Sequence, residues 1–117
     1  LRVPVSGYEF EEFIHGIYNA INEDSVVILL DTGIEERVPT MKKILSQWSD
    51  YIIISGQSAQ DEIDFKVQSA KNADYSVLEY ILWIFMICEK VSAMKGIDIQ
   101  TTKDTSFHAK LGSKKLR

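Results

Sequence analysis

Val26-Val27-Ile28-Leu29-Leu30 is the stretch that decides the fold of this chain of 117 residues. All five residues are apolar, three are β-branched, and the short turn sequence Asp31-Thr32-Gly33 follows them directly. A strand that is apolar on both faces is typical of a parallel sheet that helices cover on both sides. We therefore expect a buried strand over residues 26–30 with parallel neighbours.

Three other segments also predict strands. Tyr51–Ile54 is a second buried apolar run, whereas residues 1–6 and 63–67 alternate only weakly between apolar and polar side chains. The weaker segments predict short strands, the second of them at an edge of the sheet.

Helices are predicted over residues 9–22, 36–48 and 76–95, where apolar residues recur at helical spacing. The helix over 36–48 must hold Pro39 in its first turn, where no backbone N–H is needed. Its expected buried residues are Val38, Met41, Ile44, Leu45 and Trp48. In the last helix Ile81–Cys88 is apolar on every side, which favours complete burial or a subunit interface.

The resulting order of elements is β-α-β-α-β-β-α. This order predicts an α/β layered domain with a mostly parallel sheet. Ligands of such sheets bind beyond the carboxyl ends of the strands. The sequence therefore places residues 31–33 and Ser55-Gly56-Gln57-Ser58 at the candidate ligand-binding edge.

Composition narrows the class of protein. Apolar content of 45% and charged content of 26% suit one globular domain, and a net charge of −4 argues against a nucleic-acid-binding protein. No apolar run is long enough to span a bilayer. The single cysteine, Cys88, fits a reducing compartment, so we expect a cytoplasmic protein. Because Leu1 is not a methionine, we expect the chain to be part of a longer protein.

Candidate acid–base chemistry is concentrated on the first helix. Glu11 and Glu12 precede His15 by four and three residues, so all three side chains share one helical face. A carboxylate beside an imidazole can set its tautomer for proton transfer. The alternative is an ordinary amphipathic helix with a solvated polar face. Gly16 follows directly and leaves room for a ligand or another backbone.

The other candidate features are weaker. The two histidines and the scattered acids have no metal-ligand spacing, so no metal or other cofactor is expected. Ser55 and Ser58 would cradle a phosphate with hydroxyl and N–H groups, or they simply form a strand-end turn. Residues 103–117 carry a net charge of about +4. This basic tail, with Lys110, either completes an anion site or is a frayed terminus.

Two stretches together resemble the sugar isomerase (SIS) domain of phosphosugar enzymes. Glu12-Phe13-Ile14-His15-Gly16, followed by a polar turn and the strand over 26–30, is similar to the E-x-x-H-G-P region in the isomerase half of glucosamine-6-phosphate synthase. Lys95-Gly96-Ile97-Asp98, followed by Phe107-His108-Ala109-Lys110, is similar to the K-G-x-D segment and lysine-bearing tail of the same proteins. The chain looks closest to bacterial fructosamine-phosphate deglycases, and it has Ile17 where the family pattern has proline.

The resemblance implies a flavodoxin-like SIS three-layer sandwich that lacks its first strand and helix here. It implies a partial SIS domain over residues 1–99, the second SIS half of a longer protein, and a basic tail over residues 100–117 that packs toward the active site. It also implies a phosphorylated sugar or amino sugar as ligand, and we expect a homodimer or higher homo-oligomer. The net charge and the short apolar runs predict no nucleic-acid or membrane partner.

The resemblance further implies roles for particular residues. His15 would assist opening of the sugar ring, and Glu12 would orient the imidazole of His15. Lys110 would contact the open-chain sugar. Gly16, Ser55 and Ser58 are the expected substrate-binding residues. The glutamate that shuttles the proton lies upstream of this chain, so we expect the chain alone to be inactive.

The expected function is metal-free proton transfer in an aldose–ketose isomerase, or in an amino-sugar or fructosamine 6-phosphate deglycase. The alternative is a non-catalytic module that senses phosphosugars in a transcriptional regulator. A third option is a dimerisation segment whose main asset is the apolar helix over 76–95.

Overall fold

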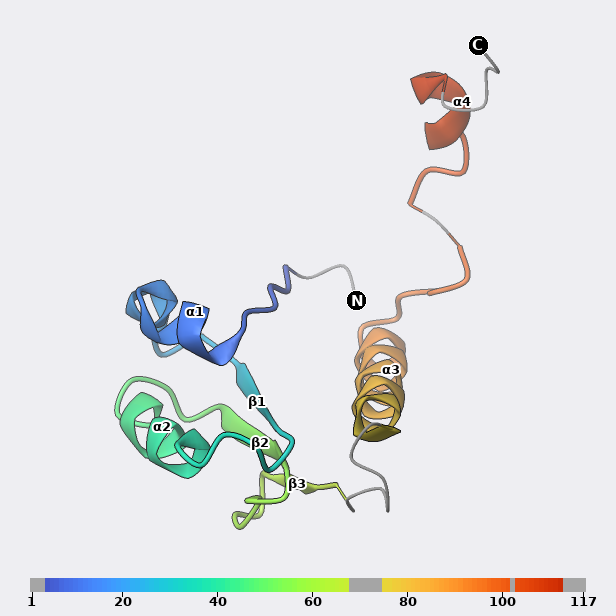
Figure 1. Ribbon diagram of the computed structural model, residues 1–117. Coiled ribbons are helices and arrows are strands. Elements are labelled where there is room, and N and C mark those ends of the chain that lie inside the picture. Colours follow the sequence, from blue (N-terminus) through green and yellow to red (C-terminus); the bar gives the residue numbers. More distant parts are fainter. Residues whose placement is uncertain (1–3, 68–74, 102, 113–117) are drawn as a thin grey trace. The chain divides into compact units, whose positions relative to one another are not determined.

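A computed structural model of the chain describes residues 4–67, 75–101 and 103–112, without the side chains at positions 76 and 77. The elements of this structure follow one another along the chain as Figure 1 shows. They are α1 (Phe10–Ile14), the 3-10 helix η1 (Ile17–Ala20), β1 (Val27–Asp31), α2 (Val38–Leu45), β2 (Ile52–Gly56), β3 (Phe65–Lys66), α3 (Ser76–Met94) and α4 (Phe107–Leu111).

The described residues form two compact units. One unit runs from Pro4 to Trp83, and the other contains the described residues from Ile84 onward, so the division falls inside α3. The first unit holds the sheet and the helices that pack on it, and it also holds every contact of Glu12, His15 and Ser58 described below. The expected division into residues 1–99 and 100–117 stays a prediction.

The sheet has three strands in the order β1-β2-β3, and both pairs are parallel. β1 and β2 pair from Val27 opposite Ile52 to Asp31 opposite Gly56. Parallel neighbours need a crossover connection, and α2 provides it between β1 and β2. The predicted α/β class and parallel sheet are confirmed, as are strands close to residues 26–30 and 51–54.

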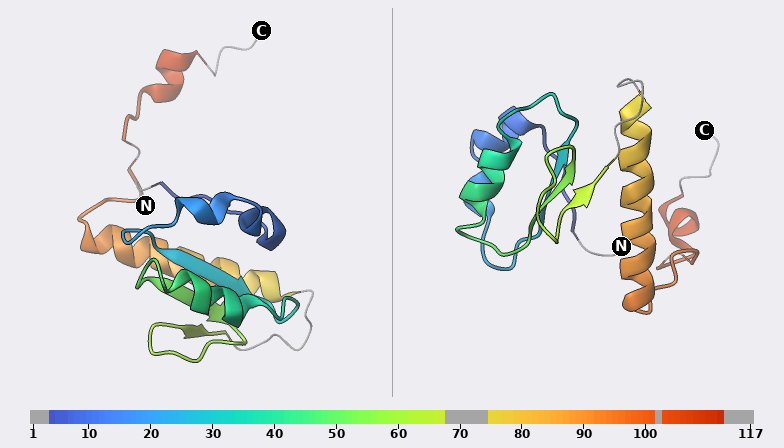
Figure 2. Two further views of the ribbon diagram at one scale, coloured as in Figure 1. Left: turned by 90° about the vertical axis from the view of Figure 1, so that its left-hand side faces the viewer. Right: turned by 90° about the horizontal axis from the view of Figure 1, so that it is seen from below.

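The core of the first unit lies between the sheet and two helices. Figure 2 shows α1 and α2 on one face of the sheet. Met41, Leu45 and Ile52 form the buried centre, with 8%, 2% and 1% of their surfaces exposed. Partly buried residues surround it: Phe10, Phe13, Ile14, Ile21, Val27 and Leu29. Full burial of one large apolar side chain, such as Leu45, stabilises a fold by about 2 kcal/mol, so this layer contributes strongly to the stability of the unit.

The other face of β1 is more open than the sequence predicts. Ile28 and Leu30 are 38% and 45% exposed, whereas Val27 and Leu29, which alternate with them, pack on the core. β1 is the outermost strand of the sheet within the described residues, so its apolar residues on this face have a neighbouring strand on one side only. The expectation that helices cover both faces of this strand is therefore not met at Ile28 and Leu30.

The single helix predicted over residues 9–22 is wrong. The chain forms five residues of α-helix, interrupts at His15 and Gly16, and continues as four residues of 3-10 helix. Gly16 has φ = 152°, which no helix contains and which residues with a Cβ rarely adopt. The apolar stripe is still used, because its residues on both sides of the break pack on the core.

The second predicted helix is shorter than expected. α2 ends at Leu45, and Pro39 lies in its first turn as predicted. Ile44 and Trp48 were expected to be buried, but they are 47% and 41% exposed. Trp48 lies beyond the helix and stacks on Tyr18 of η1 with the ring centres 6.1 Å apart. These side chains therefore line an apolar groove between α1, η1 and α2, of about 360 Å³, instead of the core.

The remaining predictions differ mainly in their bounds. Residues 1–3 of the strand predicted over 1–6 lie outside the described part, and residues 4–6 form no strand. The edge strand predicted over 63–67 contains only two residues, and the last long helix ends one residue early, at Met94. The tail contains a short helix, α4, that the sequence pattern did not predict. No helix within the described residues has both the length and the apolar character needed to cross a membrane.

A buried ion pair fastens the loop after β2 to α2. Lys42 Nζ lies 2.6 Å from Asp64 Oδ1 and 2.6 Å from Asp61 Oδ2. The side chain of Asp64 is only 2% exposed, and that of Asp61 is 64% exposed. The Asp64 carboxylate also accepts hydrogen bonds from the N–H groups of Ile54, Gln60 and Asp61. One side chain therefore satisfies three backbone donors and a buried cation, a cluster that no motif in the sequence indicates.

These contacts shift the pKa of Asp64. Burial alone would raise this pKa, but the hydrogen bonds from Lys42, Ile54, Asp61 and Gln60 outweigh burial and lower the pKa from 3.8 to about 2. A carboxyl group with a lowered pKa in the folded state contributes stability above its unfolded pKa and loses it as the pH falls through the folded value. The contribution of Asp64 is therefore complete above about pH 4 and lost near pH 2.

We predict that Asp64→Asn lowers the free energy of unfolding by about 2–4 kcal/mol at pH 7, because Lys42 loses a buried partner. Asp61→Asn removes the exposed partner of the same lysine and should cost less than about 1 kcal/mol. Urea unfolding of the purified protein that contains this chain measures both values. The deficit of Asp64→Asn should shrink as the pH falls from about 4 to about 2, and equal deficits in the two variants would contradict this account.

Candidate functional site

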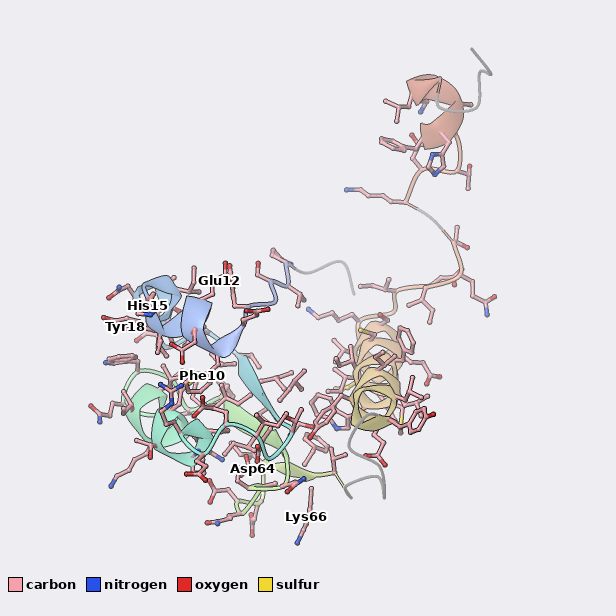
Figure 3. All side chains as sticks on the ribbon, viewed as in Figure 1. Phe10, Glu12, His15, Tyr18, Asp64 and Lys66 are labelled. Atoms are coloured by element: carbon pink, nitrogen blue, oxygen red, sulfur yellow. The ribbon has the colours of Figure 1, made fainter. Side chains whose placement is uncertain are left out.

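The histidine of the Glu/His segment lies at the exposed end of α1. His15 is the C-cap of the helix, and its N–H donates to the carbonyl oxygen of Glu12 at 3.3 Å. Gly16 follows with its positive φ, so the backbone turns away immediately after the imidazole. The His15 side chain is 78% exposed, and Figure 3 shows it on the outside of the helix. The ring is therefore accessible to a ligand.

The carboxylate nearest the imidazole belongs to Glu11. Glu11 Oε2 lies 3.8 Å from His15 Nε2, an ion-pair distance across one helical turn. The exposed side chain of Glu12 makes no hydrogen bond or ion pair with any residue in the described ranges. The structure thus brings His15 together with Glu11, and it places Glu12 beside them without a contact to the ring.

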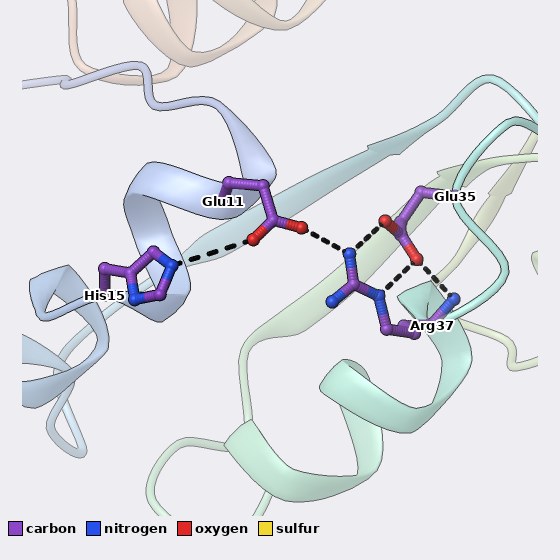
Figure 4. A network of polar contacts seen from close by, with 4 residues as sticks. All are labelled: Glu11, His15, Glu35 and Arg37. Carbon is purple, nitrogen blue, oxygen red and sulfur yellow. Dashed lines mark hydrogen bonds and ion pairs between the residues drawn. The ribbon is translucent and has the colours of Figure 1, made fainter.

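Arg37 connects this helix to the loop that follows β1. Its Nη2 donates to Glu11 Oε1 at 2.5 Å and to Glu35 Oε2 at 2.6 Å, and its Nε donates to Glu35 Oε1 at 2.7 Å (Figure 4). The guanidinium also lies over the Phe10 ring, 4.6 Å from its centre. Hydrogen bonds from Arg37 lower the pKa of Glu35 to about 2, and both carboxylates raise the pKa of Arg37. Residues of α1 and of the carboxyl edge of β1 therefore form one exposed polar cluster.

Asp31 organises the carboxyl edge of the sheet. It is the last residue of β1 and only 3% exposed. Its Oδ1 accepts from the Gly33 N–H at 2.8 Å, and its Oδ2 accepts from the N–H and hydroxyl of Ser58 at 2.7 and 2.6 Å. Its backbone oxygen accepts from the Tyr80 hydroxyl. One residue thus holds the loops after β1 and β2 and the first turns of α3.

The charge of Asp31 is stabilised by these donors. Burial alone would raise the pKa of Asp31, but the hydrogen bonds from the Ser58 hydroxyl and from the Gly33 and Ser58 N–H groups outweigh burial and lower it. Gly56, opposite Asp31 in the sheet, has φ = 151°, and a Cβ there would overlap the backbone oxygen of Asp31. A glycine is therefore needed for the two strand ends to meet.

Neither of the two serines predicted to bind substrate presents an exposed, unpaired donor in this structure. Both donors of Ser58 point at Asp31, so neither faces a ligand in this arrangement. Ser55 is 0% exposed, and its hydroxyl has no partner among the described residues. Ser58 does border a pocket of about 250 Å³ beside Lys42, Lys43 and Gln60. Their substrate-binding role stays a prediction.

Lys110 lies in the second unit. It is in α4, and its Nζ pairs with Asp104 Oδ2 at 2.8 Å, with the two side chains 69% and 41% exposed. The Lys110 contacts in the structure are therefore local to the tail. The other basic residues of the tail at positions 114, 115 and 117 lie outside the described residues. A role of the tail at the site stays a prediction.

Besides the cluster of Lys42 with Asp61 and Asp64, the described contacts form two polar clusters around the predicted site residues. His15, Glu11, Arg37 and Glu35 are linked in one, and Asp31 with its partners makes the other. Hydrogen bonds and ion pairs within the described residues do not join the two. Over the same residues, no three His, Cys, Asp or Glu side chains converge as metal ligands would.

Sequence reasoning missed Arg37, Glu35 and Tyr80, and it placed Asp31 at the ligand-binding edge without its role as an anchor of the loops. Arg37 belongs to no motif, and its partner Glu11 is 26 positions away in the chain. Asp31 had a signal that could have identified it, because a carboxylate directly after a buried strand and two residues before a glycine is typical of a loop anchor.

The solved structures that are similar to this chain include two from bacteria. One is from Clostridium difficile 630 and is provisionally named a phosphosugar isomerase; it shares 46% identity and a TM-score of 0.91 over 99% of this chain and 33% of that protein. The other is from Salmonella typhimurium LT2 and is provisionally named a sugar binding protein, with 40% identity and a TM-score of 0.67 over 75% of this chain and 28% of that protein. Models of protein families and curated proteins give no match.

This chain therefore has the fold of the corresponding part of a phosphosugar isomerase-like protein. It spans about a third of the length of the two proteins that it resembles.

We predict that Gly16→Ala lowers the free energy of unfolding by about 1–3 kcal/mol, because an L-residue is strained at φ = 152°. Open space surrounds this position, so the cost comes from the backbone and not from a clash. Gly7→Ala is the matched control, since a Cβ there also meets nothing and φ lies outside the strained region. Thermal unfolding compares the two variants, and an equal effect would show that the break after His15 does not require glycine.

Proposed function

We propose that this chain is the C-terminal SIS domain of a longer phosphosugar enzyme, an aldose–ketose isomerase or an amino-sugar or fructosamine 6-phosphate deglycase. The observation that carries the proposal is 46% identity over 99% of the chain to a protein named as a phosphosugar isomerase. The accessible imidazole of the E-x-x-H-G segment adds a group suited to acid–base chemistry. The ligand class is therefore a phosphorylated sugar or amino sugar.

His15 assists ring opening in this proposal. Opening a cyclic sugar removes the proton of the anomeric hydroxyl and delivers a proton to the ring oxygen. An imidazole both accepts and donates protons near neutral pH, and the exposed ring of His15 is accessible to a sugar. The Glu11 carboxylate, 3.8 Å from Nε2, is better placed to orient the ring than Glu12, to which the family pattern assigns that role.

The chemical step then moves a proton between the first two carbons of the open sugar, through an enediol or an enolamine. With a fructosamine 6-phosphate, water then hydrolyses the imine at the first carbon, which releases the amine and leaves the aldose phosphate. A glutamate outside this chain performs the proton transfer in the proposal. The electrons stay within the sugar, so the step calls for no external electron carrier. Gly16 leaves open space beside His15 for the substrate.

Lys110 steadies the open chain or the phosphate. Its ion pair with Asp104 joins two exposed side chains, and such pairs are worth less than about 1 kcal/mol. The ammonium group can therefore exchange Asp104 for a ligand anion at little cost. Because the rest of the chain is acidic and repels a phosphate, a cation from the basic tail would help to hold that group.

The protein assembles as a homodimer or larger homo-oligomer in this proposal. α3 carries exposed apolar side chains on several sides, including Leu78, Leu82 and Phe85, which are 54%, 64% and 65% exposed. Apolar surface of this kind is typical of a buried interface. The proposed compartment is the cytoplasm, because a single cysteine, Cys88, fits a reducing environment.

A sensor of phosphosugars is the second candidate function. The similarity to a protein named as a sugar binding protein favours this function. A sensor binds the sugar without turnover, so it needs no catalytic imidazole. The two candidates differ in what His15 does, and that difference can be measured.

We predict that His15→Asn lowers kcat for fructose 6-phosphate or a fructosamine 6-phosphate by about 100-fold or more, because general acid–base catalysis is lost. Thermal stability should stay within about 0.5 kcal/mol of wild type, since the ring is exposed. Calorimetry should show that the ligand still binds. Binding without turnover in the wild-type protein would favour the sensor, and wild-type turnover in the variant would remove His15 from the mechanism.

We predict that Lys110→Gln raises KM or lowers kcat for the phosphorylated substrate about tenfold, because one charge contact to the ligand is lost. Lys103→Gln, an exposed cation seven residues earlier, is the matched control and should leave both constants unchanged. Steady-state kinetics of the full-length protein compare them. An equal effect of both changes would indicate general electrostatics of the tail instead of a specific contact.

A further inference from the structure

Arg37 is held unusually firmly for an exposed side chain. Nε and Nη2 bind the two carboxylate oxygens of Glu35 in a fork, at 2.7 and 2.6 Å. The backbone N–H of Arg37 donates to the same carboxylate at 2.9 Å, and the Phe10 ring lies beneath the guanidinium. A forked pair of this kind fixes the orientation of the guanidinium plane. Arg37 is therefore set in place before any ligand arrives.

The second hydrogen of Nη2 reaches Glu11. This contact spans 2.5 Å, and it joins α1 to the residue just before α2. Nη2 thus serves a carboxylate from each of two elements. The position of the Glu11 carboxylate is therefore fixed from outside its own helix.

Without that contact, Glu11 would hold His15 poorly. The two side chains are 62% and 78% exposed and lie 3.8 Å apart. Exposed pairs at this spacing stabilise each other only weakly, and their side chains sample several rotamers. α1 is also only five residues long, so its own backbone gives little support.

We propose that Arg37 is a positioning residue for His15: through Glu11, its fixed guanidinium orients the imidazole toward the ligand. The inference rests on the proposed function, in which His15 acts on the sugar. Arg37 itself need not touch the ligand. Glu35 in turn orients Arg37, so the chain of contacts runs from the β1 loop to the imidazole, as Figure 4 shows.

The test is a double-mutant cycle in the full-length protein. Arg37→Gln and Glu11→Gln should each lower kcat about tenfold with KM nearly unchanged, because both act through the same ring. The double variant should lose no more than either single variant. Arg37→Lys should fail to restore kcat, since an ammonium group cannot form the fork with Glu35 while it binds Glu11.

Matched controls separate this role from general charge effects. Lys90→Gln removes an exposed cation of α3, and Glu36→Gln removes the carboxylate between Glu35 and Arg37. Both should keep wild-type kcat and KM. Losses in the controls equal to those in Arg37→Gln would overturn the inference, as would additive losses in the cycle or full rescue by lysine.

A readout independent of activity distinguishes this inference from the proposed function. The ring protons of His15 in the NMR spectrum should shift in Arg37→Gln as they do in Glu11→Gln, and should stay unchanged in Lys90→Gln. If those shifts appear but His15→Asn retains turnover, the proposed function fails and the orientation of the ring by Arg37 stands. If the chemical shifts of the His15 ring protons are unchanged in Arg37→Gln, the inference fails, whether or not the variants retain activity.

Discussion

The parallel pairing of β1 with β2 is the constraint on which the first unit depends. The pairing runs in register from Val27 and Ile52 to Asp31 and Gly56, so the two strands end side by side. A parallel pair cannot be joined by a tight turn, and the chain returns through α2 across one face. The same pairing therefore buries Met41 and Leu45 against Ile52 and brings the two polar loops to one edge.

Once the strand ends are adjacent, a few buried carboxylates fix the loops around them. Asp31 holds the loop after β2 through Ser58, and Asp64 holds the end of the same loop against Lys42 and the backbone of Ile54. Each carboxylate satisfies three or more donors, so neither loop leaves buried N–H groups unpaired at these points. These hydrogen bonds tie the loops to the strand ends, whereas the side chains of Glu11 and His15 are exposed.

The sequence predicted the parts of the fold that periodicity controls. Apolar runs located β1 and β2, and the parallel arrangement followed from their lack of polar alternation. The break at Gly16 was missed because the apolar stripe continues across it with helical spacing, and the backbone angle leaves no trace in the pattern. Trp48 was misplaced because the pattern does not tell where α2 ends, and Ile44, which lies inside α2, faces the apolar groove instead of the core.

The candidate site was predictable only in part. His15 and its acidic neighbours follow from local spacing, but the choice of Glu11 over Glu12 as the partner depends on a helix end and on Arg37. That contact joins residues 26 positions apart, and nothing local to either residue announces it. Similarly, Ser58 looked like a free donor in the sequence, and only the fold shows that Asp31 occupies both of its hydrogens.

The close approach of Gly56 to Asp31 bears on how this protein can diversify. Any side chain at position 56 would begin inside the van der Waals radius of a backbone atom, and no rotamer relieves that overlap. A saturation library at position 56 that is selected for folded protein would therefore return only glycine.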